Sequence, residues 1–199
     1  MTDTTLNQTP RGNRLHIAIF GRRNTGKSSL INALTNQNIA IVSDVPGTTT
    51  DPVYKSMEIL PIGPVVIIDT AGIDDTGQLG TLRIEKTYRV LVKTDLMLLV
   101  IDLSSGTGEF EEDVIRRAQE NKVPVILVLN KIDLYPSSVA KELNLRFKLP
   151  VIPVSALTRQ GIEELKLAMI KSAPKEWVAP TIVGDLISPG DTVVLVVPI

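Results

Sequence analysis

The chain contains no cysteine and only one histidine, and both shortages limit the metal sites and catalytic groups that it can form. Without thiols, these 199 residues hold no disulfide, no thiolate metal site, no cysteine nucleophile and no cysteine-ligated iron–sulfur cluster. The single histidine, His16, lies inside an apolar run. A packed strand residue is a simpler interpretation of His16 than a metal ligand.

Long apolar runs and a strong net charge are also absent. The longest apolar stretches, such as "DLMLLVID" and "VPVILVLN", reach about eight residues, against roughly 20 for a membrane-spanning helix. Residues 1–13, "MTDTTLNQTPRGN", lack the apolar core of a signal peptide and predict a disordered polar lead-in. A net charge of -1 gives no overall attraction to nucleic acid or acidic lipid. We therefore expect a cytoplasmic protein with neither a membrane nor a nucleic acid partner.

Apolar runs rich in valine and isoleucine alternate with helix-like stretches along the chain. The runs are continuous, which is typical of strands buried on both faces of a parallel sheet; they cover residues 15–20, 64–68, 96–101, 123–129 and 150–154. The helix-like stretches between them cover residues 27–35, 81–93, 109–122, 137–148 and 161–173. Strand followed by helix, repeated, predicts a doubly wound α/β domain over residues 14–174.

The character of the sequence changes after Pro174. Turn residues become frequent in 175–199, and the segment closes on "TVVLVVPI", a run of high β-propensity. We expect 175–199 to be a linker and the start of a second domain that is truncated at Ile199.

The stretch "GRRNTGKS", residues 21–28, fits the pattern G-x-x-x-x-G-K-[ST] between a predicted strand and a predicted helix. Gly21 and Gly26 let the backbone turn so that its amides converge on phosphate oxygens at the positive end of the helix. Lys27 adds a charge over the terminal phosphates, and Ser28 offers a hydroxyl to Mg²⁺. The alternative is a glycine-rich turn with an exposed lysine. The predicted phosphate-loop contacts are Gly21, Asn24, Thr25, Gly26, Lys27, Ser28 and Ser29.

Three further polar motifs close apolar strands: "DTAG" at 69–72, "NKID" at 130–133 and "SAL" at 155–157. An open α/β sheet binds its ligand at the carboxyl ends of its strands, where all these motifs stand. Asp69 could hold the water shell of the magnesium ion, and the amide of Gly72 could meet the terminal phosphate. Together the motifs predict a nucleoside triphosphate site, with Lys27 and Gly72 among its catalytic groups.

The "NKID" and "SAL" motifs predict that the base is guanine. Asp133 can accept two hydrogen bonds from the ring N–H and the amine of guanine, whereas adenine offers neither, and an unpaired, partly buried carboxylate would cost several kcal/mol. Asn130 would brace the base and the phosphate loop, and Lys131 would lay its stem along the ring. The backbone amides of Ser155 and Ala156 would donate to the guanine oxygen. The expected ligands are therefore GTP and GDP.

With these motifs in place, the chain resembles the translation-factor-like P-loop GTPases, and above all their TrmE/Era-like branch of tRNA modification and ribosome assembly. The resemblance rests on "GRRNTGKSSLINAL", "VSDVPGTTTD", "DTAG", "NKID" and "SAL", and covers residues 15 to 172. It implies a mostly parallel six-stranded sheet with helices on both faces, and hydrolysis of GTP to GDP and phosphate.

Two residues take roles from this resemblance alone. Thr49, in the first switch, would join Mg²⁺ when the third phosphate is present, although a solvent-facing threonine is the alternative. Asn24 would supply an oxygen to a K⁺ ion that neutralises the transition state. The alternative for Asn24 is a loop asparagine that tolerates an unusual backbone angle.

The group that activates the catalytic water is not assigned. Ile73 stands where many switch GTPases carry a glutamine, and Gly80 stands where the tRNA-modifying relatives carry a glutamate. Without such a group we expect slow basal hydrolysis, on the order of 10⁻⁴ to 10⁻² per second.

The tail and the segment "TTTDPVYKSMEILPIGPVVIIDTAGIDDTGQLG" resemble the HydF family of [FeFe]-hydrogenase maturation GTPases. This implies metallocluster assembly, protein partners of hydrogenase maturation, a homodimer of the full-length protein, and cluster ligands beyond residue 199. Two alternatives stay open. One is an RNA-directed GTPase of tRNA modification or ribosome assembly, and the other is a GTP-loaded interaction module whose hydrolysis is incidental.

Overall fold

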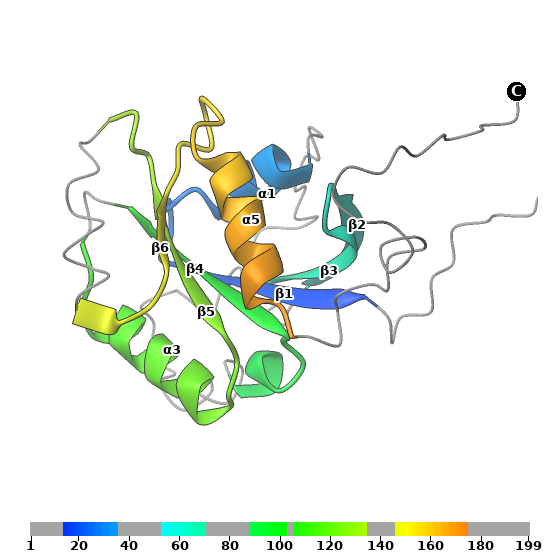
Figure 1. The fold of residues 1–199 in the computed structure, drawn as a ribbon. Coiled ribbons are helices and arrows are strands. Elements are labelled where there is room, and N and C mark those ends of the chain that lie inside the picture. Colours follow the sequence, from blue (N-terminus) through cyan, green and yellow to red (C-terminus); the bar gives the residue numbers. More distant parts are fainter. Residues whose placement is uncertain (1–13, 36–52, 71–87, 103–105, 135–145, 175–199) are drawn as a thin grey trace, which may run out of the picture.

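A computed structural model describes residues 14–35, 53–70, 88–102, 106–134 and 146–174, and all structural statements below concern these residues. They form a six-stranded sheet in the order β2-β3-β1-β4-β5-β6 (Figure 1). The strands are β1 (Leu15–Phe20), β2 (Val53–Ile59), β3 (Gly63–Asp69), β4 (Leu96–Asp102), β5 (Val125–Asn130) and β6 (Val151–Pro153). β2 and β3 are antiparallel and all other neighbouring strands are parallel. The predicted mostly parallel six-stranded sheet is confirmed.

Five of the strands coincide with the continuous apolar runs, and β2 is the one that those runs did not mark. β2 lies at the edge of the sheet, and along Tyr54–Glu58 exposed residues alternate with half-buried ones. This period of two belongs to a strand with one solvated face. A short turn over residues 60–62 joins β2 to β3, which accounts for their antiparallel pairing.

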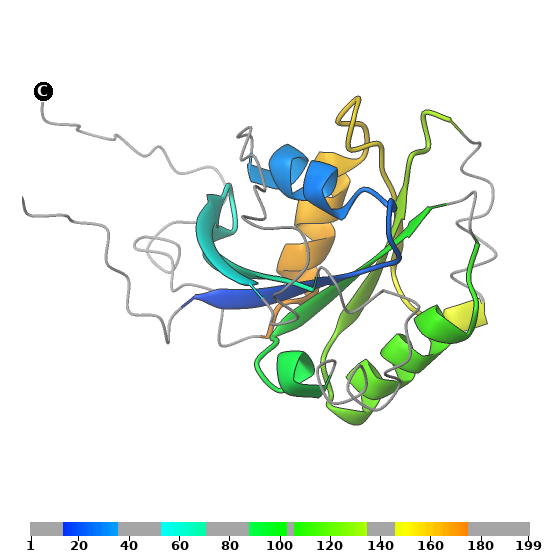
Figure 2. The same ribbon diagram turned by 180° about the vertical axis from the view of Figure 1, so that it is seen from behind.

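Helices cover both faces of the sheet, as predicted (Figures 1 and 2). α1 (Lys27–Thr35) and α5 (Ile162–Ser172) pack on one face, and α3 (Glu109–Glu120) packs on the other with a helical turn at 88–91. Alternate residues of β1 serve the two cores: Ile17 and Ile19 face α1 and α5, while Ala18 and Phe20 face α3. Of the helices expected at 81–93 and 137–148, only residues 88–93 and 146–148 lie among the described residues. Residues 88–91 and 146–147 are helical, whereas 92, 93 and 148 are not.

α3 is an amphipathic helix with charged groups on its outer face. Its first turn carries acidic residues, which suits the positive end of the helix dipole. Partial burial of Asp113 favours its protonated form, but hydrogen bonds from Arg117 and Arg116 outweigh this and lower its pKa. No described helix has the length and hydropathy needed to cross a membrane. The predicted lead-in at 1–13 and the predicted linker at 175–199 lie outside the described residues.

Candidate functional site

The loop that joins β1 to α1 packs directly against two neighbouring strands. Gly21 has a φ of 151° and Gly26 a φ of 91°, angles that L side chains rarely adopt. A Cβ atom at Gly21 would overlap the carbonyl oxygen of Val100 at β4, and one at Gly26 would overlap the side-chain amide of Asn130 at the end of β5. Both glycines are therefore required by close packing as well as by the turn itself.

The Lys27 side chain folds back over this loop. Its Nζ atom donates to the carbonyl oxygens of Gly21 at 2.5 Å and Arg22 at 2.9 Å. α1 begins here, with Ser28 and Ser29 exposed in its first turn. The first amides of a helix have no partner within it and favour an anion. The described geometry thus places a fixed ammonium beside a helix N-terminus, which suits a polyphosphate.

Asn130 joins two of the loops that the sequence assigned to the site. Its side chain is 2% exposed, its Nδ2 atom donates to the Thr25 carbonyl at 2.9 Å, and its Oδ1 atom accepts from the Ala156 amide at 3.1 Å. The predicted brace between Asn130 and the phosphate loop is present in the structure. Contact between Asn130 and the base stays a prediction.

The loop after β6 uses its own polar groups to hold its shape. The Ser155 amide donates to the Gln160 carbonyl at 2.9 Å, and Ser155 Oγ accepts from the Thr158 amide at 3.1 Å. Both amides that the sequence assigned to the guanine oxygen, those of Ser155 and Ala156, therefore have protein acceptors here. Their contact with the base stays a prediction.

The "NKID" turn presents its two charged residues differently. Lys131 Nζ donates to Asp102 Oδ2 at 2.6 Å, and Asp102 is a buried carboxylate at the end of β4. Asp133 is exposed in this structure, whereas the sequence suggested a partly buried carboxylate. Sequence reasoning missed Asp102, although an acidic residue that closes the run "LMLLVI" is the kind of signal that marked Asp69.

Thr49 and Gly72 lie outside the described residues. Asp69 ends β3 beside Ile19 of β1, at the same edge of the sheet as the phosphate loop, but its side chain is not described. Asn24 is exposed and has a φ of 63°. This is the unusual backbone angle expected if Asn24 is a loop asparagine rather than an ion ligand.

A family model described as a 50S ribosome-binding GTPase matches residues 16–131, which is more than half of the chain. The chain belongs to this family of GTPases. Within the family it is a P-loop GTPase of the TrmE/Era-like type, as the sequence predicted, and GTP hydrolysis is its reaction.

Two curated relatives are similar over most of this chain but are much longer. The tRNA modification GTPase MnmE of Nitrosomonas europaea is 40% identical over 160 residues, which cover 80% of this chain and 35% of MnmE. GTPase Der of Nitratiruptor is 38% identical over 169 residues, which cover 80% of this chain and 36% of Der. The chain therefore spans about a third of the length of these curated relatives.

Among solved structures, Era in complex with MgGDPNP and nucleotides 1506–1542 of 16S ribosomal RNA has a similar fold. The TM-score is 0.65 at 29% identity, and the match covers 80% of this chain and 57% of Era. This similarity supports the P-loop GTPase fold that the sheet order and helices show.

Proposed function

We propose that this chain is a Mg²⁺-dependent nucleotide switch that selects guanine nucleotides, hydrolyses GTP slowly, and changes its partner contacts with the nucleotide state. The observation that carries the proposal is the junction at Asn130, which ties the Lys27 loop to the loops predicted to read the base. A phosphate site and a base site fixed to each other select the whole nucleotide rather than its parts.

The proposed metal ligands are the hydroxyls of Ser28 and Thr49 and, through water, the carboxylate of Asp69. These hard oxygen donors fit Mg²⁺, which prefers a few protein oxygens together with water and substrate phosphates. When bound by these residues, the ion would supply positive charge that offsets the charge developing on the phosphates. Lys27 and the Gly72 amide would hold the non-bridging oxygens of the terminal phosphate while water attacks its phosphorus.

Calorimetric titration of the chain with GTP, GDP and ATP tests this assignment. We expect uptake of both guanine nucleotides and at least a hundredfold preference over ATP, because the carboxylate of Asp133 gains partners only from guanine. Equal uptake of ATP would contradict the proposal. The basal rate should stay below about one per second, because no residue is assigned to activate the water.

We also propose that Asn24 makes hydrolysis dependent on K⁺. The positive φ of Asn24 is by itself a reason for an asparagine at this position, because asparagine tolerates such an angle. A test of the ion must therefore keep the backbone angle and remove only the side-chain oxygen. Asn24→Gly keeps the backbone angle and removes the oxygen. We expect faster turnover in K⁺ than in Na⁺ at equal ionic strength for the wild type, and no difference for Asn24→Gly. Equal wild-type rates in the two salts would rule out the ion.

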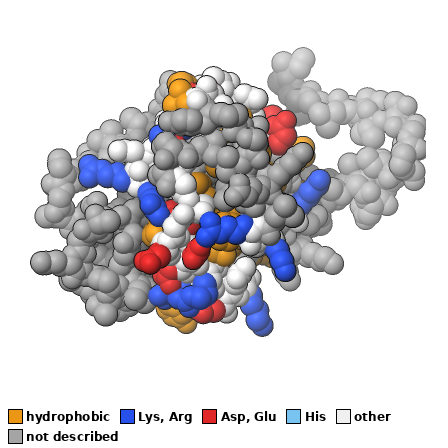
Figure 3. All heavy atoms as spheres, turned by 90° about the vertical axis from the view of Figure 1, so that its left-hand side faces the viewer, with side chains coloured by type: hydrophobic (Ala, Val, Ile, Leu, Met, Phe, Trp, Pro, Cys, Tyr) orange, Lys and Arg blue, Asp and Glu red, His pale blue; other side chains and the backbone are white. Residues whose placement is uncertain are grey.

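For the whole protein, the relatives favour an RNA-directed GTPase. One relative is named for tRNA modification, and Era has been solved with ribosomal RNA. The net charge of -1 argues for no nucleic acid partner, and on the face in Figure 3 lysines and arginines are interspersed with acidic side chains. An RNA contact would therefore rest on a local patch or on a part of the protein beyond this chain.

The second candidate is hydrogenase maturation, and the sequence of residues 175–199 favours it. In this proposal the tail begins a dimerisation domain, the full-length protein is a homodimer, and the switch controls protein partners in metallocluster assembly. The third candidate is an interaction module, whose partner contacts depend on bound GTP and not on its hydrolysis.

One set of binding measurements separates these roles. An RNA-directed GTPase should bind RNA with an affinity that falls steeply as salt rises, since each phosphate contact releases counterions. The maturation role predicts no such binding, and instead predicts cysteine and histidine ligand spacings in the sequence that follows residue 199. Partner affinity that depends on bound GTP but not on turnover would favour the interaction module.

A further inference from the structure

The guanidinium of Arg22, the second residue of the phosphate loop, turns toward α3. Its Nε atom donates to Glu111 Oε1 at 2.8 Å, and its Nη2 atom donates to Glu111 Oε2 at 2.7 Å. This paired contact links positions 89 residues apart in the sequence. Such a two-point contact fixes the direction of the guanidinium as well as its distance.

Glu111 is a buried charge that these contacts satisfy. Its side chain is 2% exposed in the first turn of α3, and its Oε2 atom also accepts from the Gly108 amide at 2.7 Å. A Cβ atom at Gly108 would lie 2.8 Å from Arg22 Nη2, so the guanidinium fits closely between Gly108 and Glu111. The Arg22 side chain is therefore held on two sides.

The backbone carbonyl of the same residue serves the phosphate site. It accepts from Lys27 Nζ at 2.9 Å and from Thr25 Oγ1 at 2.9 Å. Arg22 thus faces α3 with its side chain and Lys27 with its carbonyl. Because both contacts start from the same α-carbon, the contact with Glu111 limits the orientations open to the peptide that carries this carbonyl.

We propose that Glu111 is a positioning residue for GTP binding and hydrolysis. By fixing the Arg22 guanidinium, Glu111 holds the carbonyl that receives the Lys27 ammonium, and so sets where that charge meets the terminal phosphates. Glu111 acts through Arg22 and has no contact with the nucleotide itself. The contact between Lys27 and the phosphates is the part of this inference that rests on the proposed function.

A purely structural pair would stabilise the domain without aligning Lys27, and three variants separate the two roles. Arg22→Met leaves the Glu111 carboxylate buried without its main partner, so it should unfold at the lowest urea concentration. Glu111→Leu leaves a half-exposed arginine that water can reach. The double variant Arg22→Met/Glu111→Leu removes both charges, and an apolar pair of similar size restores much of the lost stability.

If Glu111 positions Lys27, the double variant should regain stability without regaining its affinity for nucleotide. We expect the affinity for GDP and the kcat/KM for GTP to fall about tenfold or more in Glu111→Leu and equally in the double variant, because small displacements at a phosphate site are costly. Calorimetry with Mg²⁺ and GDP measures the first, and phosphate release measures the second. If Arg22→Met does not fold, the other two variants decide.

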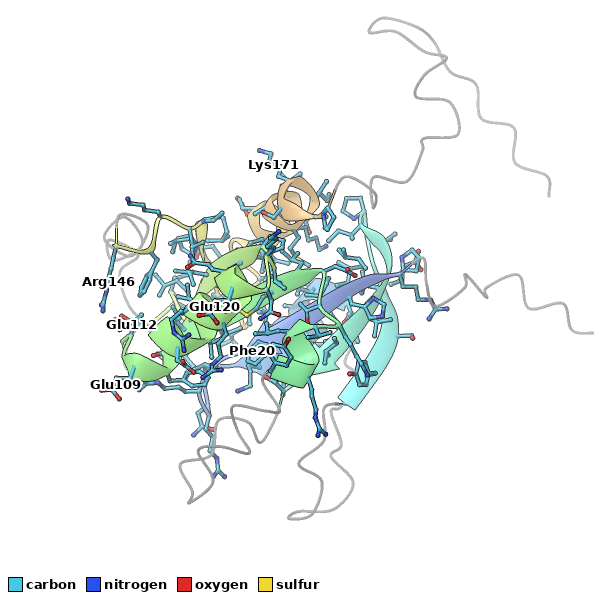
Figure 4. All side chains as sticks on the ribbon, turned by 90° about the horizontal axis from the view of Figure 1, so that it is seen from below. Phe20, Glu109, Glu112, Glu120, Arg146 and Lys171 are labelled. Carbon is cyan, nitrogen blue, oxygen red and sulfur yellow. The ribbon has the colours of Figure 1, made fainter. Side chains whose placement is uncertain are left out.

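Glu112 supplies the matched control. It is the next residue of α3 and forms an ion pair with Arg146, which lies beside it at the start of the helix (Figure 4). Glu112→Leu also removes an acidic partner of an arginine, yet it leaves the phosphate loop untouched. Its GDP affinity should stay within about twofold of the wild type, as expected for an exposed ion pair.

The outcomes are distinct. Recovery of both stability and GDP affinity in the double variant would overturn the positioning role, as would an equal loss of affinity in Glu112→Leu. Failure of the wild-type chain itself to bind GDP would instead refute the proposed function. Loss of affinity in a double variant as stable as the wild type would support the inference.

Discussion

Replacement of Asn130 by alanine should lower both the stability of the domain and its affinity for nucleotide. The asparagine is 2% exposed, and its side chain satisfies the Thr25 carbonyl and the Ala156 amide at once. Each buried polar group that loses its partner costs about 1 to 3 kcal/mol. The two losses together should lower the free energy of unfolding by about 2 to 6 kcal/mol in Asn130→Ala.

Urea unfolding of the nucleotide-free chain measures this loss, and calorimetry with GDP measures its effect on the site. We expect the GDP affinity of Asn130→Ala to fall at least about tenfold, because the two loops no longer hold each other in place. The control is Asn121→Ala, since Asn121 Nδ2 donates to a single carbonyl, that of Arg117, at the end of α3. Its cost should be about 1 kcal/mol without a change in GDP affinity. Equal effects of the two substitutions would refute the reasoning.

Three further predictions concern the backbone, the base and the pH dependence. Gly161→Ala should lower the free energy of unfolding by more than about 2 kcal/mol, because the φ of Gly161 is 75° and a Cβ atom there would overlap the Pro153 carbonyl. Gly63 has open space around it, so Gly63→Ala should cost only about 1 kcal/mol. Asp133→Asn should weaken GDP binding at least about tenfold in calorimetry and leave urea unfolding unchanged, since the carboxylate is exposed. Asp113→Asn should cost little at neutral pH, as its ion pairs are largely exposed, and the difference in unfolding should vanish as the pH falls through the lowered pKa of Asp113.

Each of these has a result that contradicts it. Equal costs at the two glycines would mean that the overlap with Pro153 is relieved by a small backbone shift. A drop in stability for Asp133→Asn would assign the carboxylate a structural role. For Asp113, stabilising ion pairs are lost on protonation, so a difference that grows toward acid pH would reverse the expected sign.

The sequence predicted the sheet well because the burial of parallel strands leaves a direct signature. β1, β4 and β5 are buried along almost their whole length, and their runs contain few polar residues. β2 escaped notice because an edge strand with one solvated face mixes polar and apolar residues. The phosphate loop was equally readable, since its glycines and lysine are dictated by backbone angles and charge.

The ion pairs of the site could not be predicted in this way. Arg22 and Glu111 are 89 residues apart, and Lys131 and Asp102 are 29 residues apart. The strand-end position of Asp102 marks it as a site residue, but the local sequence of neither Asp102 nor Glu111 names its basic partner. Their partners follow only from the order of strands β1, β4 and β5, which brings the loops together.

Buried polar groups at the strand ends hold the loops of this site in shape. Thr70 Oγ1 donates to the Ile19 carbonyl at 2.6 Å, and Asp102 and Asn130 pair with groups of the adjacent loops. Each of these side chains would carry a desolvation cost if its loop moved away. The loops are thus held by the same residues that end the strands. It follows that substitutions at strand ends should change nucleotide affinity, whereas conservative changes in the apolar cores should change stability alone.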